Sequence, residues 1–214
     1  MHGFLIIISF LFASLSVDAQ ENWFAIKAEK FWEIKAVQEE IQADNFNRTL
    51  LEAALFHAGN EARIAQGKEV LVWNTILNKA ARHQSDLMAN GQVLSHTWRR
   101  PHNSRKLVDR VELFGGRFSA LGENIAQFYL LDIPENEEYS LRSGIFTDEH
   151  GHKINNKSYK KLAEGCIKAW MNSPGHRENL LFSFQEIGTG VSFWVENKKG
   201  LNFDIYLCQN FATP

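Results

Sequence analysis

The sequence predicts an α+β fold with αβα layering, in which helices dominate the first part of the chain and strands close it. Three segments repeat apolar residues at the three- and four-residue steps of one helix face, namely 50–65, 74–89 and 159–171. Two segments near the C-terminus, 186–195 and 201–211, alternate apolar and polar residues as antiparallel strands do. Because these strands follow the helices instead of alternating with them, a doubly wound sheet is disfavoured.

The first 19 residues have the pattern of a signal peptide. The apolar run over 4–13 is too short to span a bilayer, and Val17 and Ala19 place small residues where a signal peptidase cleaves. We therefore expect a chain that is secreted to the extracellular space or the periplasm. Residues 20–49 are predicted as a helical N-terminal extension, and residues 50–214 as one domain.

Capping and stop signals mark the ends of the predicted helices. Thr49 and Glu52 have the spacing of a capping box at the start of the first helix. Asn74 precedes the second helix, and Gly91 follows it as the natural C′ residue. Pro174 stops the third helix, because proline lacks an N–H and disfavours α geometry in the residue before it.

Residues 132–156 are predicted as a hairpin insertion. Strands over 143–147 and 153–155 would be joined by a turn at 148–151. His150 and His152 have acidic neighbours, so a metal site is conceivable there, but a polar hairpin tip is the favoured interpretation.

Charge and cysteine content narrow the range of partners. The formal net charge is −2, and it becomes −1 when residues 1–19 are removed with Asp18, which predicts no nucleic-acid partner. No second apolar stretch is long enough for a transmembrane segment, and we expect a monomer.

Cys166 and Cys208 are equally compatible with a disulfide and with two buried free thiols. A solvated basic face is the favoured interpretation of five cations, Arg99, Arg100, Arg105, Lys106 and Arg110.

Three ionisable residues near segment ends are the candidate site. They are His96, Glu123 and His176, and Glu123 is expected to be held by partners because its neighbours are apolar. Two imidazoles and a carboxylate suit zinc or another divalent cation, with His96 and His176 as the metal ligands. The same groups could transfer protons without a metal, or form a polar cluster that only holds loops together.

Six motifs occur in order along the chain: Phe56 to Arg63, Trp73-Asn74, Ser95-His96, Gly122 to Ala126, Ser173 to Leu180 and Glu186 to Val191. Together they resemble the CAP superfamily, also called SCP-like, whose names come from cysteine-rich secretory proteins, antigen 5 and plant pathogenesis-related proteins. The small secreted bacterial members are the most similar.

The resemblance implies an αβα sandwich with a central antiparallel sheet between helical layers, and a cleft lined by two histidines and acidic residues. His96 and His176 match the cleft histidines, and Glu123 matches the glutamate of the Gly-Glu-Asn segment. Eukaryotic members have a further glutamate three residues after a helix tryptophan, where this chain has Ser173 after Trp170.

Two functions follow from this resemblance. The first is a secreted binding or interaction module whose cleft takes a metal ion, a peptide, a lipid-like ligand or a protein. The alternative is a metal-dependent hydrolase, a peptidase or esterase, in which Glu123 is the general base on a water of the ion. A metal-free hydrolase would use Ser95 or Ser173 as the nucleophile, and Asn124 is a further candidate residue of the cleft.

Overall fold

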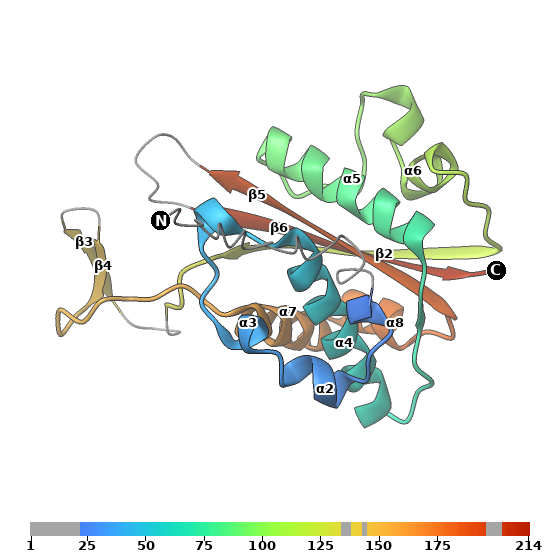
Figure 1. The fold of residues 1–214 in the computed structure, drawn as a ribbon. Coiled ribbons are helices and arrows are strands. Elements are labelled where there is room, and N and C mark those ends of the chain that lie inside the picture. The colour runs from blue at the N-terminus through green and yellow to red at the C-terminus, as the bar shows by residue number, and fades with distance from the viewer. Residues whose placement is uncertain (1–21, 134–137, 143–144, 196–202) are drawn as a thin grey trace, which may run out of the picture.

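The computed structural model describes residues 22–133, 138–142, 145–195 and 203–214, and in this part of the chain a four-stranded sheet lies between two helical layers (Figure 1). The predicted αβα arrangement is confirmed. The predicted signal peptide over 1–19 lies outside the described residues, and so does the hairpin turn that we predict at 197–200, between the two C-terminal strands.

Helices precede the long C-terminal strands, as expected. The helical elements are η1 (Asn22–Phe24), α2 (Ala28–Trp32), α3 (Lys35–Gln38), η2 (Ala43–Asn45), α4 (Arg48–Ala65), α5 (Thr75–Gly91), η3 (His102–Ser104), α6 (Leu107–Leu113), α7 (Tyr159–Asn172) and α8 (Pro174–Leu181). The strands are β1 (Val72–Trp73), β2 (Ala120–Tyr129), β3 (Tyr139–Arg142), β4 (Ile145–Asp148), β5 (Glu186–Val195) and β6 (Phe203–Thr213).

The main sheet has the strand order β1-β5-β6-β2. The three long strands are antiparallel, with Glu123 of β2 opposite Asn210 of β6 and Gly190 of β5 opposite Cys208 of β6. The short β1 is parallel to the start of β5, which makes the sheet mixed at that edge. β2 therefore forms one edge of the sheet, and most of β5 forms the other.

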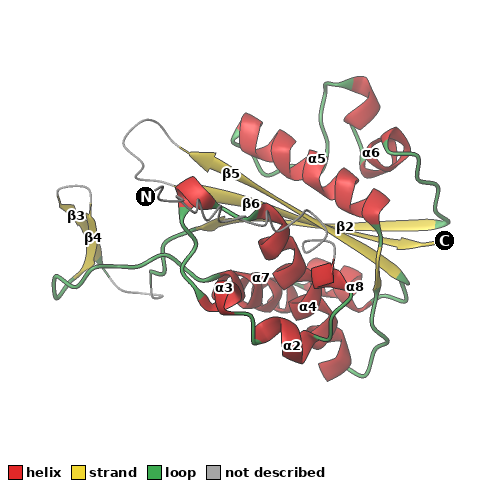
Figure 2. Ribbon diagram, viewed as in Figure 1, coloured by secondary structure: helices red, strands yellow, loops and turns green. Residues whose placement is uncertain are grey.

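Helices cover both faces of the sheet (Figure 2). α4 and α7 bury the largest apolar core against one face, and α8 packs beside them. α5 and α6 cover the other face over two smaller apolar clusters. Cys166 belongs to the first core and Cys208 to the second, so both cysteines are buried free thiols on opposite faces of the sheet.

Two predicted helix ends differ from the structure by a few residues. The Asn47 side chain, and not Thr49, caps α4 by accepting from the backbone N–H of Leu50 at 3.0 Å. At the end of α5, Gly91 is still helical and Gln92 takes the left-handed conformation with φ 51°. In both places the chain had two suitable residues close together, and the sequence pattern does not rank them.

The predicted insertion contains a hairpin that stands apart from the main sheet (Figure 1). Its ladder joins β3 to β4, with Leu141 opposite Phe146, and so it lies earlier in the chain than predicted. The predicted partner segment is held more loosely, by one bridge between Thr147 and Lys153 and one backbone bond from Ile154 to Phe146. The predicted pairing is therefore present in part, at Thr147 with Lys153 and at Phe146 with Ile154, while the main ladder of the hairpin joins β3 to β4.

The N-terminal segment is not one amphipathic helix but a series of short helical turns that wraps over the α4 and α7 layer. His57 of α4 anchors it, since its Nε2 bonds the carbonyl oxygen of Trp23 at 2.7 Å and its ring stacks on Phe31 at 4.4 Å. Phe24 stacks on Trp73 of β1 at 3.6 Å. The extension thus packs on the domain through buried aromatic contacts.

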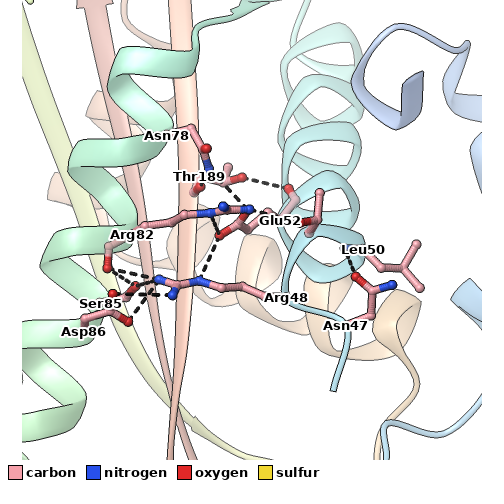
Figure 3. Close-up of polar contacts among 10 residues, drawn as sticks. Asn47, Arg48, Leu50, Glu52, Asn78, Arg82, Ser85, Asp86 and Thr189 are labelled. Atoms are coloured by element: carbon pink, nitrogen blue, oxygen red, sulfur yellow. Dashed lines mark hydrogen bonds and ion pairs between the residues drawn. The ribbon is translucent and has the colours of Figure 1, made fainter. Parts of the chain in front are cut away.

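A buried ion network joins α4 to α5 around the open edge of β5 (Figure 3). Glu52 is 0 % exposed, and its carboxylate accepts from Arg82 at 2.5 Å, from Arg48 at 3.3 Å and from Asn78 at 3.2 Å. The Thr189 hydroxyl of β5 donates to the Glu52 carbonyl at 2.8 Å. Asn78 also donates to the Thr189 carbonyl, which satisfies a strand edge that has no further neighbour there among the described strands.

Among the described residues, no helix has the length and apolar character needed to cross a bilayer.

Two glycines let the backbone of α5 approach the sheet closely. A Cβ atom on Gly190 would lie 2.1 Å from the carbonyl carbon of Ala81, and one on Gly188 would lie 2.1 Å from the amide nitrogen of Asn78. We expect Gly190→Ala to lower the free energy of unfolding by about 3 kcal/mol or more, because backbone would have to move. Gly165→Ala is the matched control, since Gly165 lies in α7 with open space around it, and it should raise stability by about 0.5 to 1 kcal/mol. Urea unfolding measures both, and equal effects would contradict the close-packing argument.

The free energy of unfolding should fall as the pH falls, and His57 contributes to this dependence. Burial lowers the pKa of His57, so the unfolded chain binds a proton more readily than the folded one. This contribution is complete above the unfolded value of about 6.5 and is lost as pH falls below it. We expect His57→Gln to flatten the dependence of unfolding free energy on pH between neutral and mildly acidic conditions. The exposed His102, changed to Gln, should leave the slope as in the wild type.

Candidate functional site

The predicted site residues meet at the free edge of β2. Successive side chains of a strand point to opposite faces, so Glu123 and Asn124 serve different layers. Glu123 points to the α5 and α6 side, where it contacts His96 and Arg110. Asn124 points to α8, where its amide donates to the carbonyl of His176 at 3.0 Å.

Glu123 is held by partners, as the sequence predicted. It is 8 % exposed, its Oε1 accepts from His96 Nδ1 at 2.8 Å, and its Oε2 accepts from Arg110 Nη2 at 2.6 Å. The buried Cys208 thiol lies 3.6 Å from the same Oε2. Both carboxylate oxygens are therefore engaged by groups of the protein.

Arg110 is the functional residue that the sequence interpretation missed. It was assigned to a solvated basic face, but it is 0 % exposed and also donates to the carbonyls of His96 at 3.3 Å and Ser104 at 3.2 Å. The sequence pattern of α6 could have predicted the burial of Arg110, because Leu107, Arg110 and Val111 follow the i, i+3, i+4 steps of a buried face. A charge in that stripe indicates a buried partner.

The contact with Glu123 fixes the form of the His96 imidazole. A carboxylate only accepts hydrogen bonds, so Nδ1 of His96 carries the proton. The lone pair of the neutral ring is then on Nε2, which has no hydrogen-bond partner among the described residues. Glu123 thus acts on His96 as a carboxylate acts on a metal-binding histidine from outside the coordination sphere.

His176 lies in the first turn of α8, not in a turn between elements. Ser173 ends α7 and starts α8, and Pro174 is the first residue of α8, a position where its missing N–H and fixed φ are favourable. Nδ1 of His176 contacts the Ser173 hydroxyl at 2.9 Å. Asn179 completes the link to β2 by donating to the Glu123 carbonyl at 3.2 Å and to the Asn124 side chain at 3.0 Å.

The two imidazoles are close enough to influence each other. Partial burial lowers the pKa of His176, and the nearby charge of protonated His96 lowers it further. His176 is therefore neutral at pH 7. Its Nε2, like that of His96, has no partner within the part of the chain that the structure describes. We call His96, Glu123 and His176 the histidine cluster.

The two serines behave differently. The Ser95 hydroxyl donates to the carbonyl of Thr97 at 2.7 Å and so stabilises a local turn outside the histidine cluster. Ser173 does contact His176, but among the described residues no carboxylate contacts that imidazole. The pair lacks the third group that orients the base of a nucleophilic serine.

The donor set suits a divalent cation only in part. Two Nε2 atoms can serve as ligands, but a catalytic zinc site has three protein ligands and a structural site has four. Among the described residues no group of three or more His, Cys, Asp or Glu side chains is arranged to hold a metal. The described residues therefore do not supply a complete set of metal ligands.

The chain matches a known family over most of its length. Residues 56–211 match the sequence model of CAP, the Cysteine-rich secretory protein family. YkwD of Bacillus subtilis (strain 168), described as an uncharacterized protein, is 28% identical over 145 residues, which are 64% of this chain and 42% of YkwD.

A solved structure shares the fold of this chain. An extracellular protein containing an SCP domain from Bacillus anthracis str. Ames has a TM-score of 0.52 and 21% identity over 78% of this chain and 41% of that protein. An outer surface protein from Borrelia burgdorferi has a TM-score of 0.48 and 16% identity over 74% of this chain and 89% of that chain. This chain spans less than half the length of YkwD and of the B. anthracis protein.

Loss of Arg110 should strongly destabilise the protein. Arg110→Met leaves the buried Glu123 carboxylate without its main counter-charge, and such a change costs about 3 to 5 kcal/mol of unfolding free energy. Arg105→Met is the control, because Arg105 is exposed in the adjoining loop and its loss should change stability by no more than about 0.5 kcal/mol. The double variant Arg110→Met/Glu123→Leu should recover part of the loss. If the two single variants were equally stable in urea, Arg110 would not hold the cluster.

Proposed function

The chain belongs to the CAP family of cysteine-rich secretory proteins, and from this membership we propose that it is a secreted binding module whose ligand binds at the histidine cluster. The observation that carries the proposal is that both carboxylate oxygens of Glu123 are hydrogen-bonded within the protein. Glu123 is 8 % exposed and bonds Arg110 and His96 through one oxygen each, which favours a role in positioning His96 over a role as a base.

This arrangement supports binding over hydrolysis. A general base must reach the proton that it removes, directly or through one water. Glu123 is 8 % exposed, and taking up a proton would weaken its charge-assisted bond to the buried Arg110. Ser173, the other candidate for chemistry, contacts an imidazole that no described carboxylate orients.

The groups that remain for a ligand are the two Nε2 atoms of His96 and His176. Both rings are anchored at Nδ1, so the protein orients their Nε2 atoms before a ligand arrives, and Nε2 of His176 is free to bind a cation when its Nδ1 donates to the Ser173 hydroxyl. A divalent cation such as zinc is the ligand that this pair suits best. When bound, the ion would supply positive charge and open positions for polar groups of a peptide or a lipid-like molecule.

Secretion is part of the proposal. The predicted signal peptide over 1–19 supports it, and so does the similarity to the B. anthracis protein, which is an extracellular protein. The chain would then act outside the cytoplasm as a monomer, with its ligand supplied by the surroundings.

Zinc titration into chelator-stripped protein tests the proposal. We expect one site in the wild type, and a loss of affinity of at least about tenfold in His96→Ala and in His176→Ala, because each removes one of two ligands. Glu123→Gln should weaken binding by about 10- to 100-fold without removing a ligand, since it changes the group that orients His96. Calorimetry measures the affinity and the stoichiometry.

The control is His102→Ala, which removes an exposed histidine near the cluster and should bind like the wild type. Equal zinc binding by all variants, or no zinc binding by the wild type, would contradict the metal proposal. Turnover of a peptide or an ester that is lost in Glu123→Gln, with the fold retained, would instead establish the hydrolase.

A further inference from the structure

The segment 97–106, which we call the cationic loop, concentrates positive charge beside the histidine cluster. It contains Arg99, Arg100, Arg105 and Lys106, together with His102. Between Asp86 and Asp109 the sequence has no carboxylate. The total charge of the chain, −2, therefore conceals a strongly cationic stretch.

The cations of this loop are exposed and are not neutralised within the described part of the chain. The four Lys and Arg side chains have no ion-pair partner among the residues that the structure describes. The nearest carboxylates are used elsewhere, because Asp86 pairs with Arg48 at 3.0 Å and Asp109 accepts from the backbone N–H of Lys106 at 2.9 Å. Their charge is available to a partner.

The backbone of the loop is held in one shape by several buried contacts. The N–H of Trp98 donates to the carbonyl of Arg105 at 2.9 Å, which closes the neck of the loop. The indole of Trp98 donates to Gln84 of α5 at 2.9 Å, and the Ser104 hydroxyl contacts His83 of α5 at 2.8 Å. In Figure 1 this loop is the green chain between α5 and α6. Compact loops with close ends and fixed frames frequently carry function.

We propose that the cationic loop binds an acidic polysaccharide, a polymer that carries sulfate, carboxylate or phosphate groups. One exposed ion pair contributes little in water, so a useful affinity needs several pairs formed at once. Each of the three guanidinium groups can donate two hydrogen bonds to one anionic group. Together they suit a polymer with repeated anionic groups.

The apolar content of the loop favours a soluble polymer over a membrane surface. None of the exposed large apolar side chains of the described residues lies within the cationic loop, 97–106, although Val93, Leu94 and Val108 are exposed on either side of it. Trp98, the one aromatic residue of the loop, is half-buried with its indole N–H bonded. A segment that enters a lipid interface normally presents such side chains outward.

This inference goes beyond the proposed function and needs no metal. Arg110 donates to Glu123 and to the carbonyl of Ser104, so the loop and the histidine cluster share one anchor. Their ligand groups are nevertheless different side chains, which lets one experiment separate them.

The test is binding of a heparin fragment to the full chain in the presence of a chelator, at about 50 mM and about 150 mM salt. The variant is Arg99→Gln/Arg100→Gln/Arg105→Gln, and the control Lys68→Gln/Lys79→Gln/Lys168→Gln removes the same charge from exposed lysines elsewhere. We expect the loop variant to bind about tenfold more weakly and to lose most of the salt dependence, while the control stays within about twofold of the wild type. His96→Ala should bind heparin like the wild type.

Equal losses in the loop variant and the control would show that only total charge matters and would overturn the proposal. So would the absence of wild-type binding at the lower salt concentration. Stronger binding to vesicles of about 30% phosphatidylglycerol in phosphatidylcholine, lost in the loop variant, would assign the loop to a membrane and reject the polysaccharide. Loss of zinc binding with heparin binding retained would reject the proposed function alone.

Discussion

A fully buried carboxylate on α4 fixes how the two helical layers lie across the sheet. Burial raises the pKa of Glu52, and its charge is tolerated only because Arg82, Arg48 and Asn78 surround it. Arg82 and Asn78 belong to α5 in the opposite layer, so the two layers are joined around the β5 edge and not through the sheet. α5 cannot slide along the sheet without separating this ion pair, and its close backbone approach at β5 leaves no room for it to tilt. The layer arrangement thus depends on one buried charge and its partners.

The opposite edge of the sheet uses the same type of interaction to build the candidate site. At β2, the buried pair of Glu123 and Arg110 joins the strand to α6, and the Glu123 backbone carbonyl accepts from Asn179 of α8. One residue of β2 therefore receives contacts from both layers. His96 and His176 come from segments far apart in the sequence, and they meet because each is tied to Glu123 or to its neighbour Asn124. A strand edge would otherwise expose unpaired carbonyls, and here side chains of the site satisfy them.

The long elements could be predicted from the sequence because their apolar periodicity depends only on burial. The partners of the buried charged residues could not be predicted in the same way. Glu52 and Arg110 both lie on buried helix faces. A charge in an apolar helix stripe indicates burial, but only the fold shows which partner it meets. The meeting of His96, Glu123 and His176 was predicted by family resemblance, not by spacing, because no local rule links segments that are 27 and 53 residues apart. The capping residues of α4 and α5 and the β3–β4 ladder were not predicted. At these places neighbouring residues have similar local preferences, and tertiary contacts decide between them.

The distribution of charge separates the scaffold from what is left for a ligand. The buried ions are matched within the protein, so Glu52, Arg82, Glu123 and Arg110 contribute to the fold and to the orientation of neighbours. Two kinds of group remain for a ligand near the β2 edge, the Nε2 atoms of His96 and His176 and the exposed positive charge of the cationic loop. The first kind suits the proposed cation and the second the proposed anionic polymer, and the two proposals are compatible because acidic polymers carry condensed counter-ions. A divalent ion presented by such a polymer would meet both sets of groups at once, although each set acts through its own residues.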